Sequence, residues 1–146
     1  MTNYLSASKS RCEERAPIIV SEEERKKHTA NNVDKCVVRH YKIDGDVIPG
    51  SHTAKCDFLV LNDESKQAYF IELKGSDVIH AIDQVEETVS LLKSELCGYI
   101  LHGRVVCKRV PKHDNSKVTE RKLKYQKNNH GGTLGTSGQG QYTEDI

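Results

Sequence analysis

The amino-acid sequence predicts an α/β fold, because strand-like and helix-like patterns alternate along the chain. Residues 56–61 and 68–74 are apolar runs separated by a short polar stretch, as in a β-hairpin. Residues 77–96, preceded by Ser76 as a helix cap, carry apolar side chains at intervals of three and four positions, the spacing of an amphipathic helix. Residues 98–107 form another apolar run of strand character. We therefore expect a sheet with a helix packed on it.

Length and composition indicate one domain. The chain of 146 residues contains 29% charged and 36% apolar residues, which suffices for a single core with polar edges. We expect a polar N-terminal segment over residues 1–20, the folded domain over 21–128, and a glycine-rich tail or edge strand over 129–146.

The sequence also indicates the cellular compartment of the protein. No apolar stretch has the length of a membrane span, and no signal peptide is recognisable, so no membrane association is expected. The five cysteines are odd in number and lack Cys-x-x-Cys spacing, which argues against a disulfide framework and suits a reducing compartment. We expect a cytoplasmic protein, or a nuclear one if the host has a nucleus.

Further elements are expected on both sides of the predicted hairpin. Ser21, followed three positions later by Glu24, forms a capping box that predicts a helix over residues 21–32. Residues 33–41 have the character of a strand. A short helix is expected from residue 117 to about residue 127. The elements up to residue 107 therefore follow the order helix, strand, strand, strand, helix, strand.

The predicted hairpin carries charged residues in otherwise apolar strands. Asp57 opens the first strand, and Glu72 and Lys74 lie at the end of the second. A turn symmetric about residues 64 and 65 would place Asp57 opposite Glu72, and directly opposed residues share a face of the sheet. Lys74 lies two positions beyond Glu72 and is expected on that face as well. The same register pairs Leu59 with Phe70 and Leu61 with Ala68.

Two neighbouring carboxylates repel each other, so a structure that places them side by side needs a compensating positive charge. A divalent cation would supply that charge, and so would Lys74. Mg²⁺ prefers oxygen ligands and is often held by one or two carboxylates together with substrate phosphates. The pattern therefore indicates a metal site. The alternative is that Asp57 bonds local backbone at the strand entry while Glu72 and Lys74 face solvent.

Charge is distributed unevenly along the chain. Residues 63–95 contain eight acidic and three basic residues, whereas residues 104–127 contain nine basic and two acidic residues. A basic flank beside a metal site would hold a polyanion. The candidates for phosphate binding are Lys108, Arg109, Lys112, Arg121 and Lys124. The alternative is an ordinary solvated basic helix.

The order of the elements, with Asp57 on one strand and Glu72-Leu73-Lys74 on the next, resembles the PD-(D/E)xK nuclease superfamily. This resemblance implies a restriction-endonuclease-like fold, in which helices flank a central mixed β-sheet around an αβββαβ core. Cys56 stands where proline is common in the family motif. The stretch from Phe70 to Asp77, followed by an amphipathic helix, also looks like small stand-alone bacterial members of the superfamily.

The resemblance implies a metal-dependent nuclease that hydrolyses phosphodiester bonds, with DNA favoured over RNA as the substrate. Asp57 and Glu72 would bind Mg²⁺ (or Mn²⁺) together with the backbone carbonyl of Leu73, and Lys74 would assist the attacking water. Gln84 would position the water, the lysine or a phosphate, its alternative being a surface glutamine of the helix. A cut through both strands would suggest a homodimer.

Some members of the superfamily add an acid on the first helix. In this sequence Glu24 is the first candidate for that role, followed by Glu22 and Glu23.

Two other classes remain open. One is a catalytically inactive nucleic-acid-binding or assembly module on the same fold. The other is a structural zinc protein, although the spacing of the available ligands is unlike that of closed zinc sites. Those ligands would be Cys97, Cys107, His102 and His113.

Overall fold

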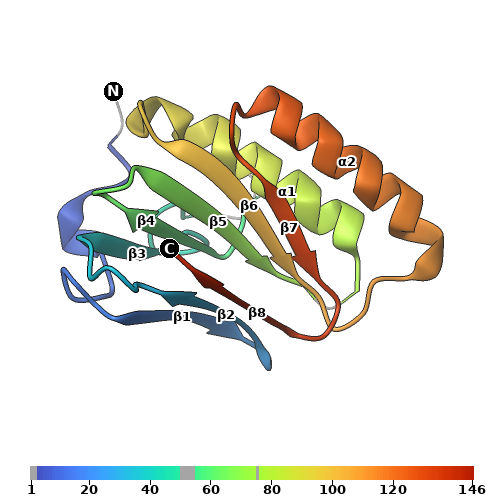
Figure 1. Cartoon of the computed structure of the whole chain (residues 1–146), viewed down its shortest axis with the longest axis horizontal. Helices are drawn as coiled ribbons and strands as arrows, with labels where there is room; N and C mark the ends of the chain where they lie inside the picture. Colours follow the sequence, from blue (N-terminus) through green and yellow to red (C-terminus); the bar gives the residue numbers. More distant parts are fainter. Residues whose placement is uncertain (1–2, 50–54, 75) are drawn as a thin grey trace.

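The computed structural model describes residues 3–49, 55–74 and 76–146. Over these residues the chain forms two α-helices and two β-sheets (Figure 1). The elements are β1 (Ile18–Glu23), β2 (Lys26–Asn31), β3 (Val38–Lys42), β4 (Phe58–Asn62), β5 (Gln67–Leu73), α1 (Val78–Leu92), β6 (Ile100–Val106), α2 (Asn115–Asn128), β7 (Leu134–Ser137) and β8 (Gln141–Asp145). No helix within the described ranges has the length and hydropathy that a membrane crossing requires.

The larger sheet has five strands in the order β3-β4-β5-β6-β7. Its β3-β4 and β4-β5 pairs are antiparallel and its β5-β6 and β6-β7 pairs are parallel, so the sheet is mixed. Helix α1 connects β5 to β6 and packs on both strands, while α2 packs on α1 and β7. Figure 1 shows both helices on the same side of this sheet. The core beneath them includes Val78, Ile82, Val85 and Leu92 of α1.

The smaller sheet covers the opposite face and has the strand order β1-β2-β8. Strands β1 and β2 form an antiparallel hairpin, and β8 runs parallel to β2. A second core lies between the two sheets and includes Ile19, Ala30, Val60 and Ile71. Because both faces of the larger sheet are covered, every residue of β4 is buried. This explains why residues 58–61 of β4 are continuously apolar rather than alternating.

Charged and aromatic side chains also connect the two sheets. Arg104 on β6 donates two hydrogen bonds to Glu144 on β8, from Nε at 2.8 Å and from Nη2 at 3.0 Å. His28 on β2 lies 2.6 Å from the same carboxylate. The Arg104 guanidinium also lies over the rings of Tyr69 and Tyr142, at 5.6 and 5.5 Å from their centroids. A buried ion pair with this many partners has its desolvation compensated, so it fixes β8 and β2 against the larger sheet.

The predicted hairpin register is confirmed where strands β4 and β5 pair. Leu59 lies opposite Phe70 and Leu61 lies opposite Ala68. The predicted strand over residues 98–107 is confirmed as β6, and the helix expected from residue 117 is confirmed as α2.

The predicted helix over residues 77–96 is confirmed in part, as α1. Its cap is Asp77 rather than Ser76, since the Asp77 side chain accepts a hydrogen bond from the amide of His80. The regular helix ends at Leu92 and continues as the 3₁₀ turn Lys93–Glu95.

The helix predicted over residues 21–32 is wrong, since most of these residues lie in the hairpin of β1 and β2. Ile19 and Ser21 are buried between exposed neighbours, and His28 and Ala30 are buried between half-buried ones. Burial with a period of two belongs to a strand. The capping box is a local signal worth about 1 kcal/mol, and the burial of one face of the hairpin outweighs it. The αβββαβ order is therefore corrected at its first element, and the chain has more strands than that core.

Two other predicted segments are refined by the structure. The strand expected over residues 33–41 begins only at Val38, because Lys35 adopts a left-handed conformation with φ of 50°. Residues 129–146 contain the edge strands β7 and β8, which make up half of this segment.

The turn between β1 and β2 is strained. Glu23 pairs with Lys26, so only Glu24 and Arg25 connect the strands. Both connecting residues have positive φ, 47° for Glu24 and 67° for Arg25. Positive φ at both central positions is typical of a type I′ turn, which favours Asn-Gly because other side chains clash with the backbone there.

We expect the double substitution Glu24→Asn and Arg25→Gly to raise the free energy of unfolding by about 1–2 kcal/mol, because these residues adopt positive φ at lower cost. Urea unfolding measures the effect. Ser65→Gly, in the exposed turn between β4 and β5 where φ is negative, serves as the control and should destabilise slightly. A double variant less stable than the unsubstituted protein would contradict the assignment of strain to this turn.

Candidate active site

The charged residues singled out in the predicted hairpin meet at the carboxyl end of β5. Asp57 directly precedes β4, Glu72 and Leu73 end β5, and Lys74 follows. The backbone amide of Leu73 donates a 2.8 Å hydrogen bond to Oδ2 of Asp57. The Asp57 amide in turn donates to the carbonyl of Ile71 at 3.0 Å. These bonds hold the Asp57 carboxyl against the strand end that carries Glu72.

Glu72 is the more deeply buried of the two acids, with 3% of its surface exposed. Burial strongly raises the pKa of Glu72, and the neighbouring Asp57 carboxyl raises it further, whereas Lys74 opposes the shift. The Oε1 atom of Glu72 is buried and forms no hydrogen bond within the described part of the chain. An unpartnered carboxyl oxygen in a buried position is costly, so this atom needs an explanation.

Asp57 is half-buried, and its carboxyl interacts with that of Glu72. Burial raises the pKa of Asp57, the Leu73 amide opposes that shift, and repulsion from Glu23 adds to it. A hydrogen bond with Glu72 favours the ionised form of Asp57, which means that the pair holds a proton mainly on Glu72. A divalent cation is able to take the place of that proton.

The donor set suits a hard cation. Asp57 and Glu72 supply carboxylate oxygens, and the Leu73 carbonyl, at the position between Glu72 and Lys74, is the backbone oxygen expected to complete the set. Within the described ranges, no group of three or more histidine, cysteine, aspartate or glutamate side chains is arranged to hold a metal ion. The pair alone matches Mg²⁺, which retains waters and commonly takes one or two protein carboxylates.

The third acid near the pair is Glu23 and not Glu24. Glu23 lies at the end of β1, and its charge acts on both Asp57 and Glu72. The Glu24 side chain is 84% exposed and lies 3.8 Å from Lys26. The structure therefore replaces the helix acid of the sequence analysis by an acid on a strand. The capping-box pattern favoured a helix and so obscured the position of Glu23. Had residues 18–23 been interpreted as a strand, their alternation would have placed Glu23 on the same face as Ile19.

The tip of the β1-β2 hairpin is held at this end of the larger sheet by Gly140. The Gly140 amide donates to the carbonyl of Cys107 at 2.8 Å, and its own carbonyl accepts from the amide of Lys27 at 3.0 Å. Cys107 directly follows β6 and its pKa is raised chiefly by burial and next by the charge of Glu72, so it adjoins the carboxylate pair. Lys26, which is 3% exposed, also acts on Cys107.

Gln84 is not brought into contact with the carboxylate pair. It lies in the second turn of α1, and its Nε2 donates to the backbone carbonyl of Lys55 at 3.1 Å. Its Oε1 is buried and unpartnered among the described residues. Gln84 thus contacts the chain two residues before Asp57, and its assignment to the site stays a prediction.

The candidate phosphate-binding residues separate into two groups. Lys108, Arg109 and Lys112 are exposed and follow the carboxyl end of β6, beside the end of β5. Arg121 on α2 instead forms ion pairs with Asp83 and Glu86 of α1, so its charge is neutralised within the protein. Lys124 is exposed farther along α2.

The alternative zinc site is not formed, because the described residues contain no such cluster of ligands. The ring nitrogens of His102 form hydrogen bonds instead, Nε2 with Oε1 of Gln67 at 2.6 Å and Nδ1 with Oγ1 of Thr133 at 3.0 Å. Cys107 is buried, whereas Cys97 and His113 are exposed.

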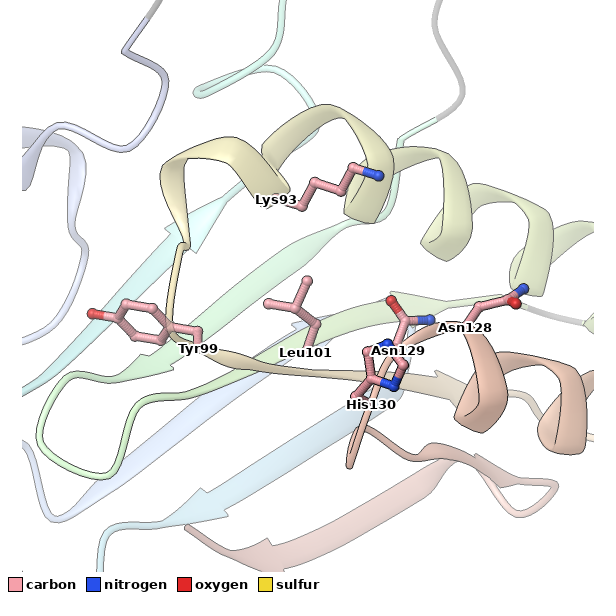
Figure 2. Close-up of a pocket in the computed structure, with 6 residues that line it drawn as sticks. All are labelled: Lys93, Tyr99, Leu101, Asn128, Asn129 and His130. Atoms are coloured by element: carbon pink, nitrogen blue, oxygen red, sulfur yellow. The ribbon is translucent and has the colours of Figure 1, made fainter.

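One surface cavity lies away from the carboxylates. Figure 2 shows a cavity of about 240 Å³ between the end of α1, the start of β6 and the end of α2. Its lining includes Lys93, Tyr99 and His130. Because β5 and β6 run parallel and Tyr99 precedes β6, this cavity lies at the opposite end of the sheet from Glu72.

The fold and the site together define an α/β domain with a buried carboxylate pair at a strand end. Comparison with protein-family models, curated proteins and solved structures finds no match for the chain.

In the metal-free protein, Glu72→Gln is expected to stabilise the fold at neutral and alkaline pH. The raised pKa of Glu72 means that the folded state binds more protons than the unfolded chain. Stability is therefore lost as the pH rises from about 4.3, the ordinary value for glutamate, toward the raised pKa. Glutamine removes this loss, which we expect to be on the order of 2 kcal/mol at about pH 8.

Urea unfolding in EDTA at several pH values measures this difference. Glu87→Gln, on the exposed face of α1, removes the same charge and should leave the pH profile unchanged. Equal pH profiles for Glu72→Gln and Glu87→Gln would contradict the raised pKa.

Proposed function

We propose that this protein is a metal-dependent nuclease that hydrolyses phosphodiester bonds, with DNA favoured over RNA. The observation that carries the proposal is the unpartnered Oε1 of the buried Glu72 beside Asp57 and Lys74. A protein gains nothing in stability from burying a repelling acid pair, so a role in binding a cation explains the arrangement.

Asp57, Glu72 and the Leu73 carbonyl would hold Mg²⁺ or Mn²⁺. When bound, the ion would neutralise the carboxylates, contact the scissile phosphate and lower the pKa of a coordinated water. The protein fixes Asp57 for this purpose through the Leu73 amide, which leaves its second carboxylate oxygen available to a ligand.

Lys74 is the residue proposed to act on the attacking water. Its charge lowers the pKa of Glu72, so the ammonium lies within electrostatic reach of the carboxylates, and it is half-buried rather than fully solvated. Its backbone amide donates to the carbonyl of Val106 at 2.9 Å, which anchors the residue to β6. From this position the ammonium would orient the water and offset the charge that develops on the phosphate.

The topology supports the same proposal. The larger sheet is mixed, and α1 is the crossover between its parallel strands β5 and β6, which supports the proposed relationship to PD-(D/E)xK nucleases. On this view the β1-β2 hairpin takes the place of the first helix, and β7 and β8 are additions.

A nucleic acid is the substrate that the surrounding charge favours. Lys108, Arg109 and Lys112 are exposed beside the carboxylates and provide positive charge where the backbone of a polyanion would pass.

Incubation with supercoiled, linear and branched DNA, with and without Mg²⁺, tests the activity. We expect Mg²⁺-dependent cleavage that Asp57→Ala and Lys74→Ala each reduce by at least about 100-fold, as is common when a metal ligand or a group that stabilises developing charge is removed. Glu87→Gln on the exposed face of α1 is the control and should cleave normally. Cleavage that survives both alanine substitutions would refute the assignment, and salt-dependent DNA binding without cleavage would select an inactive binding module.

Metal binding is tested separately from activity. Addition of Mn²⁺ is expected to raise the melting temperature of the protein, because a ligand that binds only the folded state stabilises it. Asp57→Asn should abolish most of the Mn²⁺-dependent rise while Glu87→Gln retains it. An undiminished rise in the Asp57→Asn variant would place the cation elsewhere.

A further inference from the structure

We propose that Arg25, at the strained tip of the β1-β2 hairpin, is a substrate-binding residue that contacts the phosphate backbone of the nucleic acid next to the carboxylate pair. This inference rests on the proposed nuclease function and assigns a substrate contact to a segment whose sequence predicted a helix.

The conformation of the turn gives the first argument. Glu24 and Arg25 occupy the two left-handed positions of the turn, where most side chains are unfavourable. Backbone strain of this kind is typical of functional sites, where the position of a side chain matters more than local stability. In this turn the strained pair follows Glu23, whose charge acts on Asp57 and Glu72.

The position of the turn gives the second argument. The Gly140 backbone links Lys27 of the hairpin to Cys107 at the end of β6 through bonds of 3.0 and 2.8 Å. A side-chain carbon built on Gly140 would lie only 3.7 Å from the carbonyl oxygen of Arg25, so the tip lies directly against this glycine. The backbone of Arg25 therefore lies next to the glycine that is bonded to the carboxyl end of β6, at the rim of the site.

The environment of the guanidinium gives the third argument. Arg25 is exposed, and within the described ranges its side chain forms no hydrogen bond or ion pair. Arg121, by contrast, is held by Asp83 and Glu86. An exposed arginine with all of its donors available, on the hairpin that carries Glu23, is suited to a phosphate ester, which it is able to bind through two donors at once.

The arrangement implies a path for the backbone of the substrate. Lys108 and Arg109 lie exposed after β6, and Arg25 lies at the hairpin tip, with the carboxylate pair near both. Phosphates on either side of the scissile bond would then contact one basic group each. This would hold the strand across the cation against the repulsion of Glu23.

The test is the binding of a fluorescein-labelled DNA duplex at several salt concentrations in EDTA, which withholds divalent ions and prevents cutting. Loss of one phosphate contact should reduce the slope of log affinity against log salt by about 0.9, which corresponds to about eightfold weaker binding at 0.1 M salt. We expect this change for Arg25→Ala. Arg25→Lys should retain the slope, since the slope counts charges.

Lys127→Ala is the matched control, because it removes one exposed positive charge near the far end of α2. The double variant Glu24→Asn with Arg25→Gly adds a second check, since it relieves the strain of the turn and yet should bind as weakly as Arg25→Ala. Weak binding by a variant of undiminished melting temperature excludes misfolding as the cause.

The outcomes separate this inference from the proposed function. If the unsubstituted protein binds and cleaves DNA while Arg25→Ala keeps the same salt slope as Lys127→Ala, Arg25 makes no phosphate contact and the inference fails alone. If the unsubstituted protein neither binds nor cleaves nucleic acid, both the inference and the proposed function fail.

Discussion

The burial of the Glu72 carboxyl against Asp57 is the constraint on which the other features of this end of the molecule depend. Two acids that repel each other in a partly dehydrated site destabilise the fold unless a cation or a proton joins them. Their positions are imposed by the sheet, since Glu72 ends a strand buried on both faces and Asp57 is tied to the Leu73 amide. The sheet thus holds the two carboxyl groups close together even when both are ionised and repel each other.

The buried ion pair between Arg104 and Glu144 shows the opposite arrangement. Arg104 and Glu144 form two hydrogen bonds with each other, and His28 and two aromatic rings complete their environment. This compensated ion pair fixes β8 beside β2 and beneath β6. The β7-β8 connection is fixed with it, and its Gly140 holds the hairpin tip at the carboxyl end of β6. A stabilising ion pair between the sheets therefore positions the strained turn and Glu23 near the carboxylates.

The parts of the fold that the sequence predicted are those specified by local pattern. The β4-β5 register follows from a short turn, and α1 follows from apolar spacing that only a helix satisfies. The β1-β2 hairpin was missed because Ser21 and Glu24 carry a local helix-start signal, whereas the strands depend on burial against Ile71 and on pairing with β8, more than a hundred residues away. For the same reason the hairpin register correctly placed Asp57 beside the strand end that carries Glu72, whereas Glu23 was placed on a helix instead of a strand.

Residues with a locally unfavourable conformation, hydrogen bonding or charge are concentrated around the carboxylates. Glu24 and Arg25 occupy turn positions that favour asparagine and glycine, Glu72 has an unpartnered buried oxygen, and Glu23 adds a negative charge to an already repelling pair. Each of these features lowers stability. Residues 23–25 belong to one hairpin, and Glu72 belongs to a strand that is distant from it in the sequence. In natural sequences, local conformational preference, packing and electrostatics usually favour the same structure, except where function requires otherwise. Because departures from two distant segments converge at the end of β5, the proposed binding of a cation by the acids and of a phosphate by Arg25 would explain them together, whereas unrelated local features would have no reason to meet at one place.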